Sequence, residues 1–310
     1  MATYNGSEFI TEQLKTLKDQ TRALDEVLIF DDKSTDSTVQ IVERYIDENN
    51  LQNWKIIINS TNKGYAKNFF DGMLMATGDI VFLCDQDDTW NITKVEKMCE
   101  IFENNLKINV LGGSYKANIS KNLSLFPKVL YNIHNIFRKR DGKTEKVALR
   151  ANEGYNMPGW TLCYRNKFLK DRQQYISDYS SHDGLLWRLG IASDSLYKLR
   201  MDTGEFRRYN GSTSSFSKNQ KDNEKNKNIQ VYNAEKLIKA TEIINDYILQ
   251  NNLTKSKVGK IYKIRVKYLN DRMLYLRNKN LLQYLSIFIR YNRYGSVSRW
   301  YEDFRYVISK

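Results

Sequence analysis

Cysteine and proline are scarce in this sequence of 310 residues, and long apolar runs are absent. The three cysteines (Cys84, Cys99 and Cys163) are widely spaced and form no Cys-x-x-Cys pair, which excludes a disulfide scaffold or a cysteine-rich zinc site and is typical of a reducing compartment. Two prolines and 15 glycines exclude a collagen-like or linker-dominated chain. No signal peptide opens the chain and no run of about 18 apolar residues could span a bilayer, so we expect a cytoplasmic protein.

Glycine-rich phosphate-binding loops are missing as well. Neither the P-loop pattern nor the Gly-x-Gly-x-x-Gly pattern of dinucleotide-binding enzymes occurs, which argues against ATP-dependent kinases and NAD enzymes. Apolar residues are plentiful: 41% hydrophobic and 13% aromatic residues exclude a disordered chain. The length suits one large or two modest domains.

Positive charge is concentrated at the end of the chain. The formal net charge is +13; residues 251–310 hold 14 basic residues against Asp271, Glu302 and Asp303, so this tail carries +11 and the first 250 residues carry +2. Such a distribution indicates that catalysis or binding lies in the near-neutral body. The basic tail would meet an anionic partner, either a membrane surface or nucleic acid.

Apolar strands alternate with helical segments over the first 110 residues. Residues 26–31, 54–59 and 79–84 are short runs of β-branched and aromatic side chains, which predict buried strands. Segments of helical periodicity separate them, the first of which can be capped by Ser7. The pattern predicts an α/β fold with a mostly parallel twisted sheet flanked by helices, in which ligands bind at the carboxyl ends of the strands.

Two acidic clusters follow these strands. Asp85, Asp87 and Asp88 place three carboxylates behind an apolar run, and Mg²⁺ or Mn²⁺ would relieve their repulsion, particularly an ion that substrate phosphates also hold. The alternative is a solvated acidic turn that caps the next helix. Asp31 and Asp32 end the neighbouring strand, where they either cap a helix or accept hydrogen bonds from a nucleobase or ribose.

A third loop, residues 1–6, precedes a helix and offers the ring of Tyr4 for packing on a base. Together these segments resemble the family 2 glycosyltransferases, which have the GT-A fold. The resemblance rests on motifs that match in order and spacing over about residues 1–110. They are Ala2-Thr3-Tyr4-Asn5-Gly6, Asp31-Asp32-Lys33-Ser34-Thr35-Asp36, Asn62-Lys63-Gly64, Ala76-Thr77-Gly78-Asp79 and Asp85-Gln86-Asp87-Asp88-Thr89-Trp90.

Two later segments look like parts of bacterial rhamnosyltransferase-like members of that family. Residues 181–186 resemble their His-Asp motif and residues 206–212 the basic stretch that follows it, which extends the resemblance to about residue 215. By position, the resemblance implies that Asp183 is the general base and that Asp87 binds the metal, with Asp88 nearby. The nucleotide-sugar site that it implies consists of Thr3, Tyr4, Asn5, Asp31, Asp32, Gly64, Asp85 and Asp87, with Asp32 and Asp31 towards the base and Asp85 towards the ribose.

The sequence departs from the family pattern in two places. The family has a full β-strand before the Ala-Thr-Tyr-Asn-Gly motif, whereas Met1 stands almost on it, so we expect the central strand to be missing or supplied by upstream residues. Tyr209 stands where the family has histidine, so no histidine role is expected there.

The segments around His182 and Trp160 leave alternatives open. Without the family match, Asp183 either acts in catalysis or caps the apolar helix that begins beside it. Trp160 follows a glycine and could stack on a sugar, and an ordinary core position is the alternative. Trp160 and His182 are therefore candidates for contact with the acceptor.

Basic residues in the tail surround apolar ones at helical spacing. Such an amphipathic helix, followed by Tyr and Trp, can lie in a membrane interface. The alternatives are a basic helical region packed on the body, or a nucleic-acid surface. The apolar stripe in residues 254–279 consists of Val258, Ile261, Tyr262, Leu269, Met273 and Leu276, and a mostly apolar run follows at residues 281–289.

These patterns and the resemblance predict an inverting, metal-dependent glycosyltransferase of bacterial cell-surface polysaccharide synthesis. The donor would be a nucleoside diphosphate sugar, with the His-Asp resemblance favouring dTDP-L-rhamnose and UDP-sugars left open. The acceptor would be a lipid-linked glycan or an oligosaccharide. The alternatives are a catalytically inactive sugar-nucleotide-binding or assembly protein, and a nucleic-acid-binding protein, against which the near-neutral body argues.

The predicted organisation has a catalytic domain at residues 1–215, with a nucleotide-sugar half at 1–110 and an acceptor half at 111–215. A linker at 216–230 leads to a basic helical region at 231–310, expected at the inner face of the cell membrane.

Overall fold

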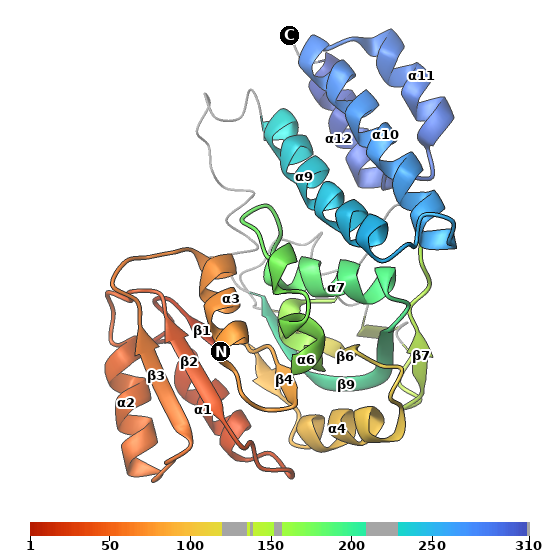
Figure 1. Cartoon of the computed structure of the whole chain (residues 1–310). Coiled ribbons are helices and arrows are strands. Elements are labelled where there is room, and N and C mark those ends of the chain that lie inside the picture. Colours follow the sequence, from red (N-terminus) through yellow and green to blue (C-terminus); the bar gives the residue numbers. More distant parts are fainter. Residues whose placement is uncertain (120–134, 137–138, 152–156, 209–228, 309–310) are drawn as a thin grey trace. The chain divides into compact units, whose positions relative to one another are not determined.

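The computed structural model describes residues 1–119, 135–136, 139–151, 157–208 and 229–308, in two compact units (Figure 1). The first unit comprises residues 1–147, 157–186 and 195–219, and the second 148–156, 187–194 and 220–310. The expected boundary at residue 215, most of the expected linker, and Tyr209 fall at 209–228, outside the described residues.

A three-stranded parallel sheet forms the amino-terminal part of the first unit. Its order is β1 (Ala2–Thr3), β2 (Val27–Asp31), β3 (Trp54–Ile58), with Ala2 opposite Phe30 and Val27 opposite Trp54. Helices α1 (Ile10–Lys18), α2 (Thr38–Glu48) and α3 (Tyr65–Met75) follow the three strands in turn. The predicted strand–helix alternation is confirmed in this part of the α/β fold.

The second sheet is mixed, with both parallel and antiparallel strand pairs. Its order is β4 (Ile80–Phe82), β8 (Leu162–Arg165), β6 (Val110–Ile119), β9 (Leu196–Arg208), β5 (Thr89–Trp90), and β7 (Thr144–Lys146) also pairs with β9. Of its pairs only β6–β9 is parallel. Residues 115–215 mix aromatic, glycine and polar positions, so no clear strand pattern predicts β8 or β9.

Apolar helix faces cover these sheets. In α4 (Lys94–Asn104), Val95, Met98, Cys99 and Phe102 recur at helical spacing and are buried. Two short helices, α6 (Asn166–Lys170) and α7 (His182–Ala192), and the 3₁₀ turn η1 (Gly159–Thr161) complete the part that surrounds the site. One core cluster of the first unit contains Ile10, Leu14, Leu17, Val27, Ile29, Val42, Trp54, Cys84, Trp90, Val95, Cys99 and Trp160.

The second unit consists mainly of α9 (Ile229–Gln250), α10 (Lys257–Asn278), α11 (Leu281–Tyr291) and α12 (Val297–Ile308). Ser256 caps α10 and Asn280 caps α11, each by accepting a backbone N–H. Buried Arg272 donates twice to Asp303 at 2.8 Å, and the Tyr275 hydroxyl donates to the same carboxylate at 2.5 Å. This buried ion pair joins α10 to α12.

The apolar stripe predicted on residues 254–279 lies in α10 and packs inside the second unit. Val258, Tyr262, Leu269, Met273 and Leu276 are all buried, and α10 contacts α9, α11 and α12. Neighbouring helices therefore cover this stripe, which favours the alternative of a packed helical region, and association of the tail with a membrane stays a prediction. None of the helices in the described part of the chain is long and apolar enough to cross a bilayer.

Candidate active site

Two loops interlock at the carboxyl ends of β1 and β2. The backbone N–H of Asn5 donates to Ser34 Oγ at 2.9 Å, and Asn5 Oδ1 accepts from the Thr35 N–H at 2.8 Å. Asn5 has φ of 47°, in the left-handed region that asparagine tolerates. Tyr4 beside it is 47% exposed, so the loop pair forms a platform that presents an aromatic ring to solvent.

Asp31 is fully buried and holds this platform together. Its Oδ2 accepts from Thr3 Oγ1 at 2.8 Å and from Ser34 Oγ at 2.6 Å, and its Oδ1 accepts from the Ser34 N–H at 2.7 Å. Both carboxylate oxygens of Asp31 thus already accept hydrogen bonds from the protein. A contact of Asp31 with a base stays a prediction that this geometry does not favour.

Asp32 ties the platform to the loop before α3. Its Oδ1 accepts from the Lys63 N–H at 2.7 Å and the Asn59 amide at 3.0 Å, and its Oδ2 accepts from the Gly64 N–H at 2.8 Å. Gly64 has φ of 81°, which a glycine adopts without strain. The predicted residues Asp32 and Gly64 are therefore direct partners, and Oδ2 retains acceptor capacity for a ligand.

Gln86 links the same platform to the acidic loop after β4, a role that its residue type does not predict. Its side-chain oxygen accepts from the Tyr4 N–H at 2.8 Å and its side-chain nitrogen donates to the Tyr4 carbonyl at 3.0 Å. A Cβ at Gly6 would lie 2.3 Å from Gln86 Oε1, so a side chain at position 6 would displace the Gln86 side chain from this position.

The acidic loop itself crowds negative charge at the carboxyl end of β4. Burial and the carboxylates of Asp87 and Asp183 raise the pKa of Asp85 to about 7. Burial, Asp85 and Asp87 also raise the pKa of Asp88. Asp88 Oδ1 accepts from the Arg207 N–H at 2.9 Å, whereas its buried Oδ2 has no hydrogen-bond partner among the described residues. A bound cation would reduce the repulsion between the carboxylates and would give Asp88 Oδ2 a partner.

The His-Asp segment supplies the other half of the site. Asp183 lies in the first turn of α7, is partly exposed, and accepts from the Gly184 N–H at 2.7 Å through Oδ1. Because Asp183 acts on the pKa of Asp85, the fold brings these two carboxylates, distant in sequence, into one charge cluster. A Cβ at Gly159 would lie 3.3 Å from Asp183 Cβ, so Gly159 allows a close approach of η1.

His182 is buried and packs on a neighbouring aromatic ring, so its side chain is not exposed to a ligand. It is 5% exposed, its ring stacks on Phe69 with centroids 3.7 Å apart, and its ring nitrogens have no hydrogen-bond partner among the described residues. Burial lowers the pKa of His182 to about 4, so the ring is neutral near pH 7. The predicted acceptor contact by His182 stays a prediction.

The comparison with protein families decides the assignment. Residues 1–171, more than half of the chain, match the family described as Glycosyl transferase family 2. The chain belongs to glycosyl transferase family 2. This family 2 chain is 28% identical over 201 residues to the dTDP-rhamnosyl transferase RfbG of Shigella flexneri, covering 60% of this chain and 63% of RfbG. It is 38% identical over 91 residues to the poly(ribitol-phosphate) beta-N-acetylglucosaminyltransferase TarS of Staphylococcus aureus, covering 29% and 16%. It thus spans less than two thirds of either relative.

Solved structures of glycosyltransferases share the GT-A fold of this family 2 chain. S. aureus TarS 1–349 in complex with UDP-GlcNAc matches with a TM-score of 0.59 and 21% identity, covering 99% of this chain and 88% of that one. The mannosyltransferase PcManGT of Pyrobaculum calidifontis, in complex with GDP-Man and Mn²⁺, matches with a TM-score of 0.55 and 16% identity, covering 96% and 75%. At these identities the likeness establishes the fold.

The acidic loop of this family 2 chain can hold a divalent metal only if a bound ligand supplies further coordinating atoms. Within the described residues, no group of three His, Cys, Asp or Glu side chains comes together to hold an ion. The unpaired Oδ2 of Asp88 and the mutual repulsion of the acidic loop nevertheless suit a cation, and Mg²⁺ or Mn²⁺ is often held by one or two carboxylates plus substrate phosphates.

Trp160 is a core residue, so the structure does not support sugar stacking by its ring. It is fully buried, and its ring packs against Tyr115 and Phe206 with centroid distances of 6.2 and 6.5 Å. Its carbonyl accepts from Lys94 Nζ at 2.6 Å. Lys94 is a further buried residue behind the acidic loop that the sequence analysis missed.

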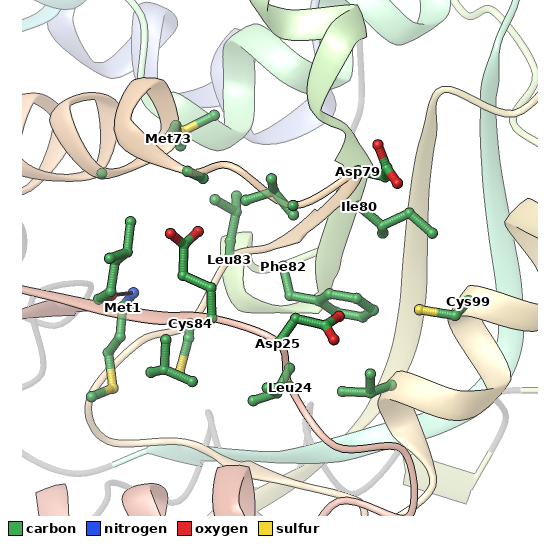
Figure 2. Close-up of a pocket in the computed structure, with 18 of the residues that line it drawn as sticks. Met1, Leu24, Asp25, Met73, Asp79, Ile80, Phe82, Leu83, Cys84 and Cys99 are labelled. Carbon is green, nitrogen blue, oxygen red and sulfur yellow. Dashed lines mark hydrogen bonds between the residues drawn. The ribbon is translucent and has the colours of Figure 1, made fainter. Parts of the chain in front are cut away.

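A cavity of about 570 Å³ lies apart from this family 2 site, between β2 and β4 (Figure 2). Its lining includes Met1, Leu28, Met73, Phe82 and Cys99, and none of the aspartates of the candidate site. The lining also includes charged side chains, among them Asp25, Asp79 and Arg165, so it mixes apolar and polar groups.

Proposed function

We propose that this family 2 glycosyltransferase transfers a sugar, with inversion, from a nucleoside diphosphate sugar to a hydroxyl group of a glycan acceptor. The observation that carries the proposal is the single charge cluster that Asp183 forms with Asp85 beside the Tyr4 platform. Family membership supports sugar transfer. The cluster supports a donor and an acceptor that meet at the carboxyl end of β4.

Asp183 is the proposed general base. It is partly exposed, and the N–H of Gly184 orients one of its oxygens, which fixes the carboxylate without neutralising it. It would take the proton of the acceptor hydroxyl as that oxygen attacks the anomeric carbon. One displacement with one base inverts the centre, so no enzymatic nucleophile is needed.

Asp87 and Asp88 are the proposed holders of Mn²⁺ or Mg²⁺. When bound, the ion would supply positive charge that stabilises the diphosphate leaving group. The Arg207 N–H keeps Asp88 in place, and Gln86 keeps the acidic loop against Tyr4. These contacts hold the carboxylates at fixed positions before any ligand arrives.

The donor is proposed to bind on the platform formed by Thr3, Tyr4 and Asn5, with Asp32 and Gly64 at its edge. The exposed ring of Tyr4 offers a stacking surface, and the neighbouring loops offer polar atoms. A dTDP-sugar is the first candidate because RfbG is a dTDP-rhamnosyl transferase, and UDP-sugars are the second because TarS binds UDP-GlcNAc. The pathway proposed is bacterial cell-surface polysaccharide synthesis.

We further propose that the second unit binds anionic membranes through α11 and α12, where a lipid-linked acceptor would lie. In α11, Tyr284, Ile287 and Tyr291 are buried, yet Leu282 and Ile289 on another face are 79% and 76% exposed. A helix that is apolar on all sides needs cover on all sides. The α11–α12 surface consists of Leu281, Leu282, Leu285, Phe288, Ile289, Val297, Tyr301 and Phe304.

The charge around this α11–α12 surface favours an anionic lipid surface as its partner. Exposed Arg290, Arg293 and Arg305 lie on or between the same helices, within a tail of net charge +11. An apolar surface flanked by arginines suits the interface of an anionic bilayer. An acidic protein partner is the alternative, which is favoured if the wild-type protein does not sediment with anionic vesicles.

A transfer assay tests the proposed activity. The protein is incubated with dTDP-L-rhamnose or UDP-GlcNAc, Mn²⁺ and oligosaccharide acceptors, and the anomeric configuration of the product is read by NMR. A product of inverted configuration supports the proposal, and a retained configuration contradicts it. Donor binding without turnover on any acceptor would favour the inactive sugar-nucleotide-binding alternative, and salt-sensitive binding of DNA without donor binding would favour the nucleic-acid alternative.

A further inference from the structure

A seam of charged and phenolic side chains joins α10 to α12 inside the second unit, where the two helices contact each other (Figure 1). It consists of Arg265, Tyr268, Arg272 and Tyr275 on α10, with Arg299 and Asp303 on α12. Arg265 and Tyr268 are fully buried, and Arg272 is 2% exposed. Burial removes the hydration of a guanidinium group, so each one needs acceptors or negative charge nearby. This α10–α12 seam thus contains three arginines and one acidic residue.

The carboxylate of the α10–α12 seam is bound to one of these arginines. Arg272 donates through Nε and Nη2 to the two oxygens of Asp303, each at 2.8 Å, and the Tyr275 hydroxyl donates to Oδ2 at 2.5 Å. In this fork geometry a guanidinium and a carboxylate satisfy each other. Both oxygens of Asp303 therefore already accept hydrogen bonds, and the charge of Arg272 is matched.

Two buried polar groups lie about one helical turn away. Arg299 Nη1 and the Tyr268 hydroxyl have no hydrogen-bond partner within the described part of the chain. Burial lowers the pKa of Arg299, and the nearby Tyr268 opposes this shift. The like charges of Arg272 and Arg265 lower the same pKa further, whereas Asp303 raises it. A buried donor without an acceptor and a guanidinium beside two others are both unfavourable.

Arg265 adds positive charge to this end of the α10–α12 seam. Its Nη1 donates to the carbonyl of Ala151 at 2.9 Å, and a carbonyl accepts a hydrogen bond without supplying a negative charge. Arg299 on the facing helix is only partly buried, which gives a small ligand access from the side of α12. The arrangement therefore favours a ligand that brings both negative charge and several acceptor oxygens.

A phosphate group meets both requirements. The planar guanidinium of an arginine matches two phosphate oxygens, and a tyrosine hydroxyl can donate to a third. We propose that the α10–α12 seam binds a phosphate group between Arg299 and Tyr268. The group can belong to free phosphate or to a lipid headgroup, because Val297 and Tyr301 of the α11–α12 surface lie on the same helix as Arg299. The site depends neither on the proposed sugar transfer nor on the proposed membrane binding.

Thermal unfolding of the full chain tests the site with inorganic phosphate as the probe. In a phosphate-free buffer, phosphate at about ten times its Kd should raise the Tm of the wild type by about 3 °C, compared with chloride at equal ionic strength. Arg299→Gln should lose most of this rise. Without phosphate the same variant should melt no lower than the wild type, because repulsion from Arg265 and Arg272 is removed. The matched control Arg305→Gln changes an exposed arginine of the same helix and should respond as the wild type does.

Tyr268→Phe separates a ligand site from a purely structural cluster. It removes a hydroxyl that has no partner among the described residues, so stability without phosphate should not fall. The Kd for phosphate should nevertheless rise at least about threefold. A loss of stability without phosphate, combined with an unchanged Kd, would overturn the proposal.

Two lipid probes distinguish the sources of the phosphate group. Dihexanoyl phosphatidic acid below its micelle concentration carries the phosphate, and dihexanoylglycerol lacks it. Binding of phosphatidic acid at least about tenfold tighter than inorganic phosphate, and dependent on Arg299, would assign a lipid headgroup, whereas similar affinities would assign free phosphate.

The proposal is overturned if phosphate does not stabilise the wild type more than chloride does. It is also overturned if wild type and Arg299→Gln respond equally, since phosphate would then bind elsewhere, for example at the donor site of the first unit. These measurements use no donor or acceptor sugar, so their failure is distinct from a failure of the proposed function.

Discussion

The buried Lys94 makes the stability of the first unit depend on pH. Its Nζ donates to the Trp160 carbonyl at 2.6 Å and lies 3.6 Å from the centroid of the Trp90 ring. Burial lowers the pKa of Lys94 from 10.5 to about 7, although nearby Asp88 and Asp85 oppose the shift. An unfolded chain keeps the ordinary pKa, so between about pH 7 and 10.5 the unfolded state binds more protons and stability rises with pH.

The size of this effect follows from the proton linkage. Each pH unit inside the window changes the free energy of unfolding by up to about 1.4 kcal/mol, so raising the pH from about 7.5 to 9.5 should contribute about 2 kcal/mol. The Lys94→Met variant lacks the titrating group. We therefore expect the difference in unfolding free energy between wild type and variant to shift by about 2 kcal/mol in favour of the wild type over this interval.

Urea unfolding followed by tryptophan fluorescence at several pH values measures that difference. Thiol and tyrosine groups titrate in both proteins and largely cancel. Lys97→Met is the matched control, because Lys97 is a partly exposed lysine of the same helix. Its difference from wild type should not follow this pH dependence. If the free energies of unfolding of wild type and Lys94→Met differ by the same amount at both ends of the pH range, the reasoning is refuted. Lys94 would then be charged in the folded protein.

Three further predictions concern the metal, the membrane and the platform. Asp87→Asn should weaken Mn²⁺-dependent donor binding about tenfold or more by calorimetry, and donor binding unchanged by EDTA would contradict the metal proposal. The double variant Leu282→Glu with Ile289→Glu should no longer sediment with anionic vesicles. The control Leu249→Glu, which changes an exposed leucine of α9, should still sediment with them. Vesicle binding by the double variant would refute the proposed role of the α11–α12 surface. Gln86→Ala should lower the free energy of unfolding by about 1 kcal/mol, measured by urea unfolding, and an unchanged value would show that the Tyr4 bonds contribute nothing.

The amino-terminal sheet was predictable because its strands are uninterrupted apolar runs. Val27–Asp31 and Trp54–Ile58 have no polar breaks apart from Lys55 and the terminal aspartate, so length and composition were enough. The strands β6, β8 and β9 were not predictable in the same way. Their pairing depends on partners far away in the sequence, and the register of β9 against β6 shifts at two places.

The acidic residues of the candidate site were predictable, but the residues that hold them in place were not. Aspartates at strand ends stand out by type, whereas Gln86, Lys94 and Gly159 matter only through contacts that the fold creates. The buried α10 stripe shows the converse limit. Helical periodicity identified its apolar face. Only the packing showed that neighbouring helices cover this face, whereas one apolar face of α11 remains exposed.

The most direct test of the proposed mechanism is the turnover of Asp183→Asn against Asp178→Asn. Asparagine keeps the shape and the contact with the Gly184 N–H but cannot take a proton, whereas Asp178 is an exposed residue shortly before the same helix. With a donor and acceptor identified, we expect kcat to fall about 10²–10⁴-fold in Asp183→Asn while the donor Kd stays within about twofold. Asp178→Asn should keep wild-type kcat. Near-normal turnover in Asp183→Asn would contradict the assignment of Asp183 as the base.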